Sequence, residues 1–593
     1  MQELRFRFIF GFLALVWAIL LLRIFILTIK TNDYFEQLAL RNMTKKEILV
    51  PTRGLILDRN HQLLAMNELG FSISLVPALK KAQLQQELEL LQRHFPTLDT
   101  QTAAQNYHKQ NSVYNHNAIQ ILDFIPYDQM QTLYPKLILD PKITISPANK
   151  RHYPGNSLAS HVLGYLGAAD AKDIQTDPKS QYTHTIGKTG LEKEYNDFLQ
   201  GEMGYKLVSV NALNQELKVL EEKQPQTNND LVLTLDKRLQ EKADLLFVDK
   251  VGAVVVMDAH TGAILAAGSY PEYNLNNFIG GISVAHWREL QDNIYNPLLN
   301  RLINGLYPPG SVVKMGSALS FLEYLPITEQ TEVFAPGYIE VGKRKFRDWK
   351  AGGHGKTNLY KALKESVDVY FYKFAQDISI DNLTKTFRQM GFGQKTGVDL
   401  PNEFIGILPD PGWKMKRFGD IWNMGDTLIT SIGQGSFLTT PLQVANYTAL
   451  IASGKLPTPH FALKGNFKVK DVLDNFQKSK LPALRRGMYE ACSTQGGTGY
   501  HTTRGVKVAL ACKTGTAQVV GIDQDTIKRV KEEQMEYFHR SHAWMTAFLP
   551  FKNPKYVITV LVEHGEGGSK DGPIVKAMAN ALVDLGYLKP TAH

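Results

Sequence analysis

The sequence predicts an α/β fold: an α/β sandwich that follows an N-terminal transmembrane helix and an elongated α+β segment. Three observations support this. An apolar run from Phe8 to Ile29 is interrupted only by Arg23. Residues 252–271 form two apolar runs around a His-Thr-Gly turn, which predicts a β-hairpin. Strand-like runs and a helix near 571–586 end the chain, so we expect strands from both ends to enclose the helical region 280–500 in one sandwich.

The first element is the apolar run. At about 1.5 Å per helical residue, its length matches the roughly 30 Å of membrane hydrocarbon. Arg5 and Arg7 precede it, which favours a short cytoplasmic tail at residues 1–7 and a transmembrane anchor at 8–29. The alternative is a cleaved signal peptide, but the bulky sequence TIKTNDYFEQL offers no small-residue cleavage site.

Two further regions follow the anchor. Residues 30–230 are predicted to form the first, with a Leu-, Gln- and Lys-rich helical insertion at about 78–140. The family resemblance described below implies that this region is a non-catalytic pedestal. The polar stretch EEKQPQTNND (221–230) reads as a linker. Residues 231–593 then form the second domain, which begins with a strand and a helix.

Composition narrows the function. The chain of 593 residues is 44% apolar and 21% charged with a net charge of +9, which is ordinary for a multidomain protein. No stripe of Lys and Arg with interleaved aromatic residues is present, so a nucleic-acid partner is not expected. Two cysteines, Cys492 and Cys512, exclude a disulfide framework and a Cys-x-x-Cys metal site. We expect Cys512 to be a small buried strand residue.

The sequence YPPGSVVKMGSALSFL (307–322) carries the first candidate catalytic residues. Pro308, Pro309 and Gly310 require a helix to start at or near Ser311. Lys314 then lies on the same face as the serine, inside an apolar helix. Burial disfavours a charged lysine, so Lys314 is a candidate base for the Ser311 hydroxyl. By itself the pattern also fits an N-capping serine with a solvent-seeking lysine.

Two more motifs follow. Ser366 and Asp368 form a Ser-x-Asp motif that can relay a proton and orient the Ser311–Lys314 pair. Lys-Thr-Gly occurs at 188–190, 395–397 and 513–515. We choose the third as the candidate catalytic motif because it lies in a predicted strand rich in β-branched residues. There Gly515 permits close approach of a substrate backbone, and the Thr516 N–H can complete an oxyanion hole with that of Ser311. Lys513 is predicted to hold a substrate carboxylate and to lower the pKa of Lys314 by repulsion.

The ordered motifs Ser311-x-x-Lys314, Ser366-x-Asp368 and Lys513-Thr514-Gly515 resemble those of the penicilloyl-serine transferases. Together with PTRGLILDRN, KRHYP, GLEKEY, PLLNR and SIGQG, they resemble class B penicillin-binding proteins over nearly the whole chain. YPPGS with Ser-x-Asp is most similar to penicillin-binding protein 2 of the rod-elongation machinery.

This resemblance implies a D,D-transpeptidase that is anchored in the bacterial inner membrane by a single span, with its catalytic domain in the periplasm. Ser311 would attack D-Ala-D-Ala in a peptidoglycan stem peptide, with Lys314 as base and Ser366 and Asp368 assisting proton transfer. Lys513, Thr514 and Thr516 would bind the donor, and a second stem peptide would resolve the acyl-enzyme. β-Lactams would trap Ser311. A SEDS-type glycosyltransferase and scaffold proteins of the elongation complex would be partners.

The sequence departs from the resemblance at a metal site. Some relatives hold structural zinc with two Asp, a His and a Cys. Here Asp348 and His354 remain, but Ala335 and Val367 occupy the other places. Two ligands do not make a closed zinc site, so no metal or other cofactor is expected. Asp348 and His354 are instead predicted to brace a loop.

Other functions stay open at this point. A division-specific class B transpeptidase shares most motifs. A D,D-carboxypeptidase or β-lactamase would need a group that activates water for deacylation. A non-catalytic β-lactam sensor would carry a degenerate site, whereas every motif residue is present.

Overall fold

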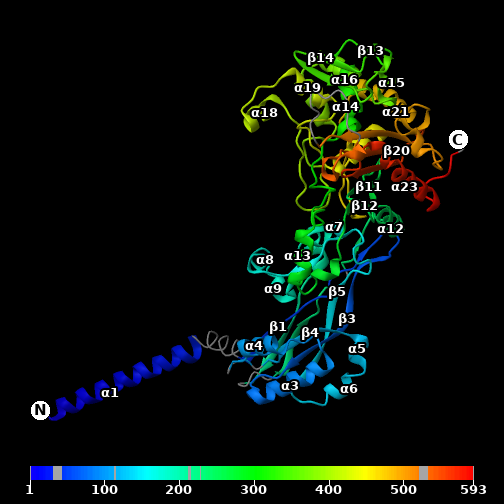
Figure 1. Cartoon of the computed structure of the whole chain (residues 1–593). Helices are drawn as coiled ribbons and strands as arrows, with labels where there is room; N and C mark the ends of the chain where they lie inside the picture. The colour runs from blue at the N-terminus through cyan, green and yellow to red at the C-terminus, as the bar shows by residue number, and fades with distance from the viewer. Residues whose placement is uncertain are drawn as a thin grey trace.

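The computed structural model describes residues 2–30, 43–112, 115, 117–211, 216–226, 229–519 and 532–591. The N-terminal helix α1 (Gln2–Phe25) lies at one end of an elongated molecule, and the C-terminal half lies at the other (Figure 1). Within Glu3–Thr28, an 18-residue stretch has a mean hydropathy of 2.6, and none of that stretch is buried. Among the described residues this is the one helix long and apolar enough to cross a membrane, and it contains most of the predicted span 8–29.

The part of the chain between α1 and the C-terminal half forms the pedestal, which occupies the lower part of the elongated body in Figure 1. It contains one three-stranded sheet, β1–β8–β9, and a second sheet in the order β10–β2–β3–β4, with β5 also paired to β3. The bounds of these strands are Thr44–Leu49 (β1), Ile56–Leu57 (β2), Leu63–Leu75 (β3), Ile119–Pro126 (β4), Ile143–His152 (β5), Gly204–Val210 (β8), Glu216–Lys223 (β9) and Leu231–Val232 (β10). Strand β9 extends to Lys223, so the first residues of the predicted linker belong to a sheet instead.

The predicted helical insertion at 78–140 does contain helices. They are α3 (Lys81–His94), α4 (Thr100–Gln110), α5 (Tyr127–Gln131) and α6 (Tyr134–Leu137). Leucines spaced three or four apart on α3 (Leu84, Leu88 and Leu91) are buried in a separate small core. Strand β4 also lies in this segment and was not predicted; its pairing with β3 gives the helices a sheet to cover.

Three sequence motifs of the pedestal meet at one buried carboxylate. Glu192 is fully buried and pairs with Arg53 at 2.7 Å and with Arg151 at 2.7 Å. Burial alone would raise the pKa of Glu192, but the two guanidinium groups hold it below its usual value. The segments PTRG, KRHYP and GLEKEY lie far apart in the sequence, and this ion cluster therefore holds them together in the folded pedestal.

The short elements between β5 and β8 complete this part of the pedestal. They are α7 (Ser160–Leu163), β6 (Leu166–Ala168), α8 (Ala171–Thr176), α9 (Ser180–Thr183), β7 (Thr185–Gly187), α10 (Gly190–Glu194) and α11 (Asn196–Gln200).

The C-terminal half is built on a five-stranded antiparallel sheet in the order β12–β11–β21–β20–β19. Its strands are Gly252–Asp258 (β11), Ile264–Tyr270 (β12), Ala511–Ala517 (β19), His542–Leu549 (β20) and Tyr556–Val562 (β21). The predicted hairpin is therefore confirmed. The pairing of β11 with β21 also confirms that the two ends of this half form one sheet.

Helices cover both faces of this sheet, as the alternation along β11 shows. Val254 and Val256 pack in a core with α12 (Lys237–Leu246) and α23 (Gly572–Asp584). Ala253 and Val255 pack on the other side with α14 (Lys314–Tyr324) and α20 (Pro441–Ser453). The predicted α/β sandwich is the observed fold.

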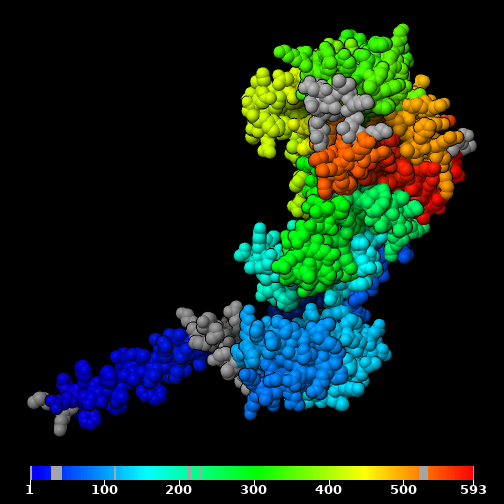
Figure 2. All heavy atoms as spheres, viewed as in Figure 1, coloured from blue at the N-terminus to red at the C-terminus, as the bar shows by residue number. Residues whose placement is uncertain are grey.

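Most of the helical middle lies above the sheet in Figure 1, at the upper end of the body in the space-filling view (Figure 2), whereas α13 (Val284–Asp292) lies below the sheet beside α8. Its remaining helices are α15 (Leu359–Lys364), α16 (Asp368–Ala375), α17 (Ile380–Gln389), α18 (Pro411–Phe418), α19 (Met424–Ser431), α21 (Asn475–Ser493) and α22 (Tyr500–Thr503). Its short strands are β13 (Val333–Ala335), β14 (Tyr338–Val341), β15 (Arg344–Arg347), β16 (Gly355–Thr357), β17 (Leu456–Pro457) and β18 (Val469–Lys470).

Candidate active site

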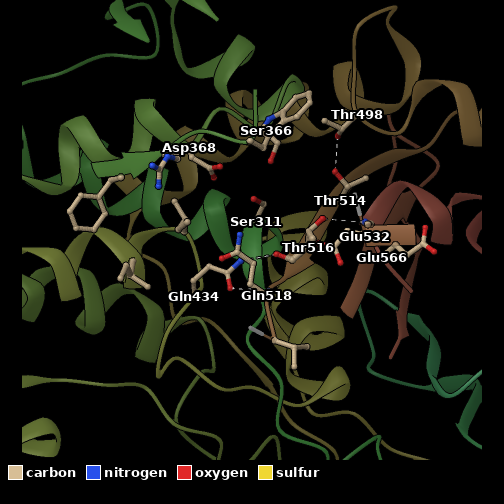
Figure 3. A pocket seen from close by; sticks show the side chains of 18 of the residues that line it. Ser311, Ser366, Asp368, Gln434, Thr498, Thr514, Thr516, Gln518, Glu532 and Glu566 are labelled. Atoms are coloured by element: carbon tan, nitrogen blue, oxygen red, sulfur yellow. Dashed lines mark hydrogen bonds between the residues drawn. The ribbon is translucent and has the colours of Figure 1, made fainter. Parts of the chain in front are cut away.

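Ser311 lies in a one-turn 3₁₀ helix, Gly310–Val313, and α14 begins at Lys314. Gly310 has a φ of 57°, which suits glycine, and its N–H donates to the Gly433 carbonyl at 2.7 Å. The serine is half-buried and borders a groove. The predicted helix start is thus confirmed, with a tighter first turn that presents the hydroxyl to the groove (Figure 3).

Lys314 is completely buried one turn after the serine. Its Nζ donates to Asp368 Oδ1 at 2.7 Å, to the Ser366 carbonyl at 2.9 Å and to Ser366 Oγ at 3.4 Å. The sequence analysis expected the second motif to orient this lysine, and Asp368 does lie beside it. Motifs one and two are therefore joined by an ion pair.

The second motif is held in an unusual backbone conformation. Ser366 has a φ of 56°, which a residue with a side chain rarely adopts, and it is buried. Two residues later Asp368 begins α16, with its side chain 14% exposed. Burial raises the pKa of Asp368, while the charge of Lys314 opposes this.

The third motif lies on β19, and of the three Lys-Thr-Gly occurrences it is the one that borders the Ser311 turn. A Cβ at Gly515 would lie 2.9 Å from the Pro309 carbonyl and 3.0 Å from Val312 Cγ1. Glycine is thus required because the strand and the serine turn pack directly together. The prediction that Gly515 makes room for a substrate backbone missed this closer neighbour.

Lys513 has a different environment from the one predicted. It is buried, and its Nζ donates to Ser366 Oγ at 2.7 Å and not into the groove. Burial, and after it the charge of Lys314, lowers the pKa of Lys513 well below the usual lysine value. The sequence analysis predicted that repulsion between the two lysines would lower the pKa of Lys314. In the structure this repulsion lowers the pKa of Lys513. The groove is lined from this strand by Thr514 and Thr516.

Two groove residues escaped sequence reasoning. Thr514 Oγ1 donates to Thr498 Oγ1 at 2.7 Å, and Gln434 Nε2 donates to the Thr516 carbonyl at 2.7 Å (Figure 3). Gln434 belongs to SIGQG, which was noted only for its resemblance. Thr498 carries no local signal, because only the tertiary structure brings its loop to β19.

These side chains surround a groove of about 1110 Å³. Figure 3 shows Ser311 at its floor, Asp368 and Ser366 on one side and Thr514 and Thr516 on the other. A Cβ at Gly310 would lie 3.3 Å from the Thr516 backbone nitrogen, so the serine turn and Thr516 are adjacent. The arrangement can support a serine nucleophile with a lysine base beside a peptide-binding edge strand.

The predicted brace at Asp348 and His354 is present. His354 Nε2 lies 3.1 Å from Asp348 Oδ1, and its Nδ1 lies 2.7 Å from Glu365 Oε2. Burial alone would lower the pKa of His354, but the two carboxylates raise it. Ala335 and Val367 are buried and carry no metal-binding atom, so this donor set does not fit a four-ligand zinc site.

Cys492 and Cys512 form a disulfide bond, which the sequence analysis did not predict. It joins the end of α21 to β19, directly before Lys513. Cys512 is buried, as expected. A Cβ at Gly499 would lie 2.6 Å from Cys492 Sγ, so the loop that carries Thr498 packs on the disulfide.

Removing this disulfide with Cys492→Ala/Cys512→Ala is expected to lower the free energy of unfolding by about 3 kcal/mol, given the loop that it closes. Thermal unfolding of the purified protein measures this as a melting temperature lower by several degrees. Reduction of the wild type without mutation is the control. Equal melting temperatures for the oxidised protein and the variant would contradict the prediction.

Two family models match the chain. The penicillin-binding protein transpeptidase domain matches residues 252–584, and the penicillin-binding protein dimerisation domain matches residues 48–233. A curated relative from Acinetobacter baumannii, peptidoglycan D,D-transpeptidase MrdA, is 36% identical over 96% of this chain and 86% of its own.

Solved structures similar to this chain belong to the same kind of protein. The penicillin-binding protein 2 of Helicobacter pylori, in a complex with MreC, matches with a TM-score of 0.87 and 61% identity over 92% of this chain and all of that one. A peptidoglycan synthase complex matches with a TM-score of 0.70 and 25% identity over 99% of each chain. The chain therefore belongs to the penicillin-binding protein transpeptidases. Within that family it is a class B protein of the penicillin-binding protein 2 type, a serine-type D,D-transpeptidase.

Proposed function

We propose that Ser311 is the nucleophile of this transpeptidase, that Lys314 is its base, and that Ser366, Asp368 and Lys513 complete a proton relay. The convergence of three distant segments on Ser366 supports this, since its Oγ lies within hydrogen-bond distance of both lysines. Lys314 would act in its neutral form: the amine would take the proton of the Ser311 hydroxyl, and the Asp368 carboxylate would stabilise the ammonium that results. Ser366 and Lys513 would then pass a proton to the departing D-Ala amine.

The substrate that we propose is a peptidoglycan stem peptide ending in D-Ala-D-Ala. Strand β19 is at the end of its sheet, so an extended peptide can add beside it, held by Thr514 and Thr516. The backbone N–H groups of Ser311 and Thr516 would form the oxyanion hole. Attack by Ser311 on the penultimate carbonyl forms an ester and releases D-Ala; the amine of a second stem peptide then displaces the serine.

The cellular role that we propose is lateral wall elongation at the inner membrane. α1 would anchor the chain with residues 1–7 in the cytoplasm, the pedestal (30–230) and transpeptidase domain (231–593) lying in the periplasm. MreC in the Helicobacter pylori complex and the synthase complex support two partners: a scaffold protein on the pedestal and a SEDS-type glycosyltransferase at the span.

The test of this function uses the full-length protein with a donor pentapeptide and an acceptor stem peptide. Mass spectrometry should find a cross-linked dimer and one D-Ala released per link. Release of D-Ala without a dimer would indicate a carboxypeptidase. Depletion in cells separates the remaining alternative: rounded cells indicate elongation, whereas filaments indicate division.

A further inference from the structure

The groove is walled on one side by a strongly basic hairpin that the catalytic motifs do not include. Strand β15 supplies Arg344, Lys345 and Arg347, all of which line the groove. Arg344 and Lys345 are exposed and Arg347 is half-buried. Lys345 pairs with Glu340 of the neighbouring strand β14 at 3.7 Å, and the two arginines leave this wall with a net positive charge.

The hairpin is fixed to the catalytic motifs. Phe346 is buried and packs its ring 5.8 Å from that of Tyr372 on α16. At the end of the strand, Asp348 Oδ2 accepts from the Val369 N–H at 3.0 Å, one residue after Asp368. The basic side chains are thus held at a set position relative to the Ser366–Asp368 motif.

The opposite side of the groove carries charges of both signs. Glu532 and Glu566 line it beside Thr516 (Figure 3), and Glu566 pairs with Arg540 and with Lys570, each at 3.3 Å. Gly568, two residues after Glu566, donates its N–H to Thr516 Oγ1 at 3.3 Å, which places that segment next to β19. The unbalanced positive charge of the groove therefore lies on the hairpin.

We propose that the β14–β15 hairpin is a carboxylate subsite that selects stem peptides by the free carboxylate groups along their length, with Arg344 and Arg347 as the binding side chains. Arginine presents a planar fork of donors that matches a carboxylate, and each such charge-assisted pair is strong where water is partly excluded. The proposal rests on the stem-peptide substrate proposed above. The ligand carboxylate belongs either to the acyl donor or to the acceptor.

The test compares stem peptides with free and amidated internal carboxylates on the full-length protein. Wild type is expected to favour the free-carboxylate peptide by about 10-fold in kcat/KM, which corresponds to one charge-assisted hydrogen bond. Arg344→Gln/Arg347→Gln should reduce this preference to about 2-fold or less. Separate reactions, one with an amidated donor peptide and one with an amidated acceptor peptide, identify which of the two stem peptides the hairpin binds.

Lys343→Gln/Lys350→Gln is the matched control. It removes two cations from the same hairpin region, at exposed positions that do not line the groove, and should retain the preference. Formation of one penicillin adduct per chain shows that each variant is folded. An unchanged preference in the arginine variant, or equal loss in the control, overturns the subsite. Absence of any reaction of the wild type with either peptide would instead count against the stem-peptide substrate.

Discussion

Ser311→Ala is expected to abolish the covalent penicillin adduct and to lower peptide cross-linking by at least about 10⁴-fold. Wild type should gain the mass of one drug molecule on the peptide that contains residue 311. The reason is chemical: in the proposed mechanism the hydroxyl oxygen at the start of the 3₁₀ turn forms the ester, and alanine has no atom that replaces it. Intact-mass measurement and peptide mapping after incubation with benzylpenicillin provide the test.

The control for this prediction is Ser569→Ala. Ser569 also lines the groove and is exposed, but it lies in the short 3₁₀ helix Gly568–Asp571 directly before α23. It should still give one adduct per chain. An adduct on the Ser311→Ala protein would reject Ser311 as the nucleophile, and rapid drug hydrolysis by wild type without an adduct would indicate a β-lactamase.

Lys314→Met is expected to slow penicillin acylation by about 10³-fold while leaving the fold intact. Methionine fills much of the lysine volume but cannot accept a proton. It also leaves the Asp368 carboxylate without its ion-pair partner at 2.7 Å, and burial already raises the pKa of Asp368. The second-order rate constant for adduct formation measures the effect.

Lys373→Met supplies the comparison for Lys314. Lys373 is an exposed lysine in the last turn of α16, the helix that Asp368 begins. Acylation and melting temperature should both stay close to wild type. If Lys314→Met acylates at the rate of Lys373→Met, then Lys314 is not the base. If its melting temperature falls sharply, Lys314→Gln, which can hydrogen-bond Asp368, separates catalysis from packing.

The residues proposed as catalytic could be selected from the sequence because short local patterns carry them. Pro-Pro-Gly before Ser311 allows a helix to start at one place, and a spacing of three places Lys314 on the same face. A predicted strand rich in β-branched residues distinguished Lys513-Thr514-Gly515 from the two other Lys-Thr-Gly occurrences. These properties depend on backbone preferences within a few residues, so a sequence alone contains them.

The partners of those residues were not predictable in the same way. The sequence predicted that Asp368 would lie against the Ser311–Lys314 pair, and the ion pair with Lys314 confirms it. It also aimed Lys513 at a substrate carboxylate, whereas the folded chain turns Lys513 toward Ser366. Thr498 and the disulfide were missed for a related reason. Contacts between segments far apart in sequence depend on how the helices pack on the sheet.

The sequence by itself therefore determined the apolar N-terminal helix, the sandwich fold and the residue proposed as the nucleophile, since hydrophobic pattern and turn chemistry act locally. The tertiary structure decided the contacts of the proposed proton relay, the disulfide beside β19 and the basic wall of the groove. Those features arise when α14, α16 and β19 bring charges together in a buried space, where desolvation and neighbouring charges set the pKa of each group.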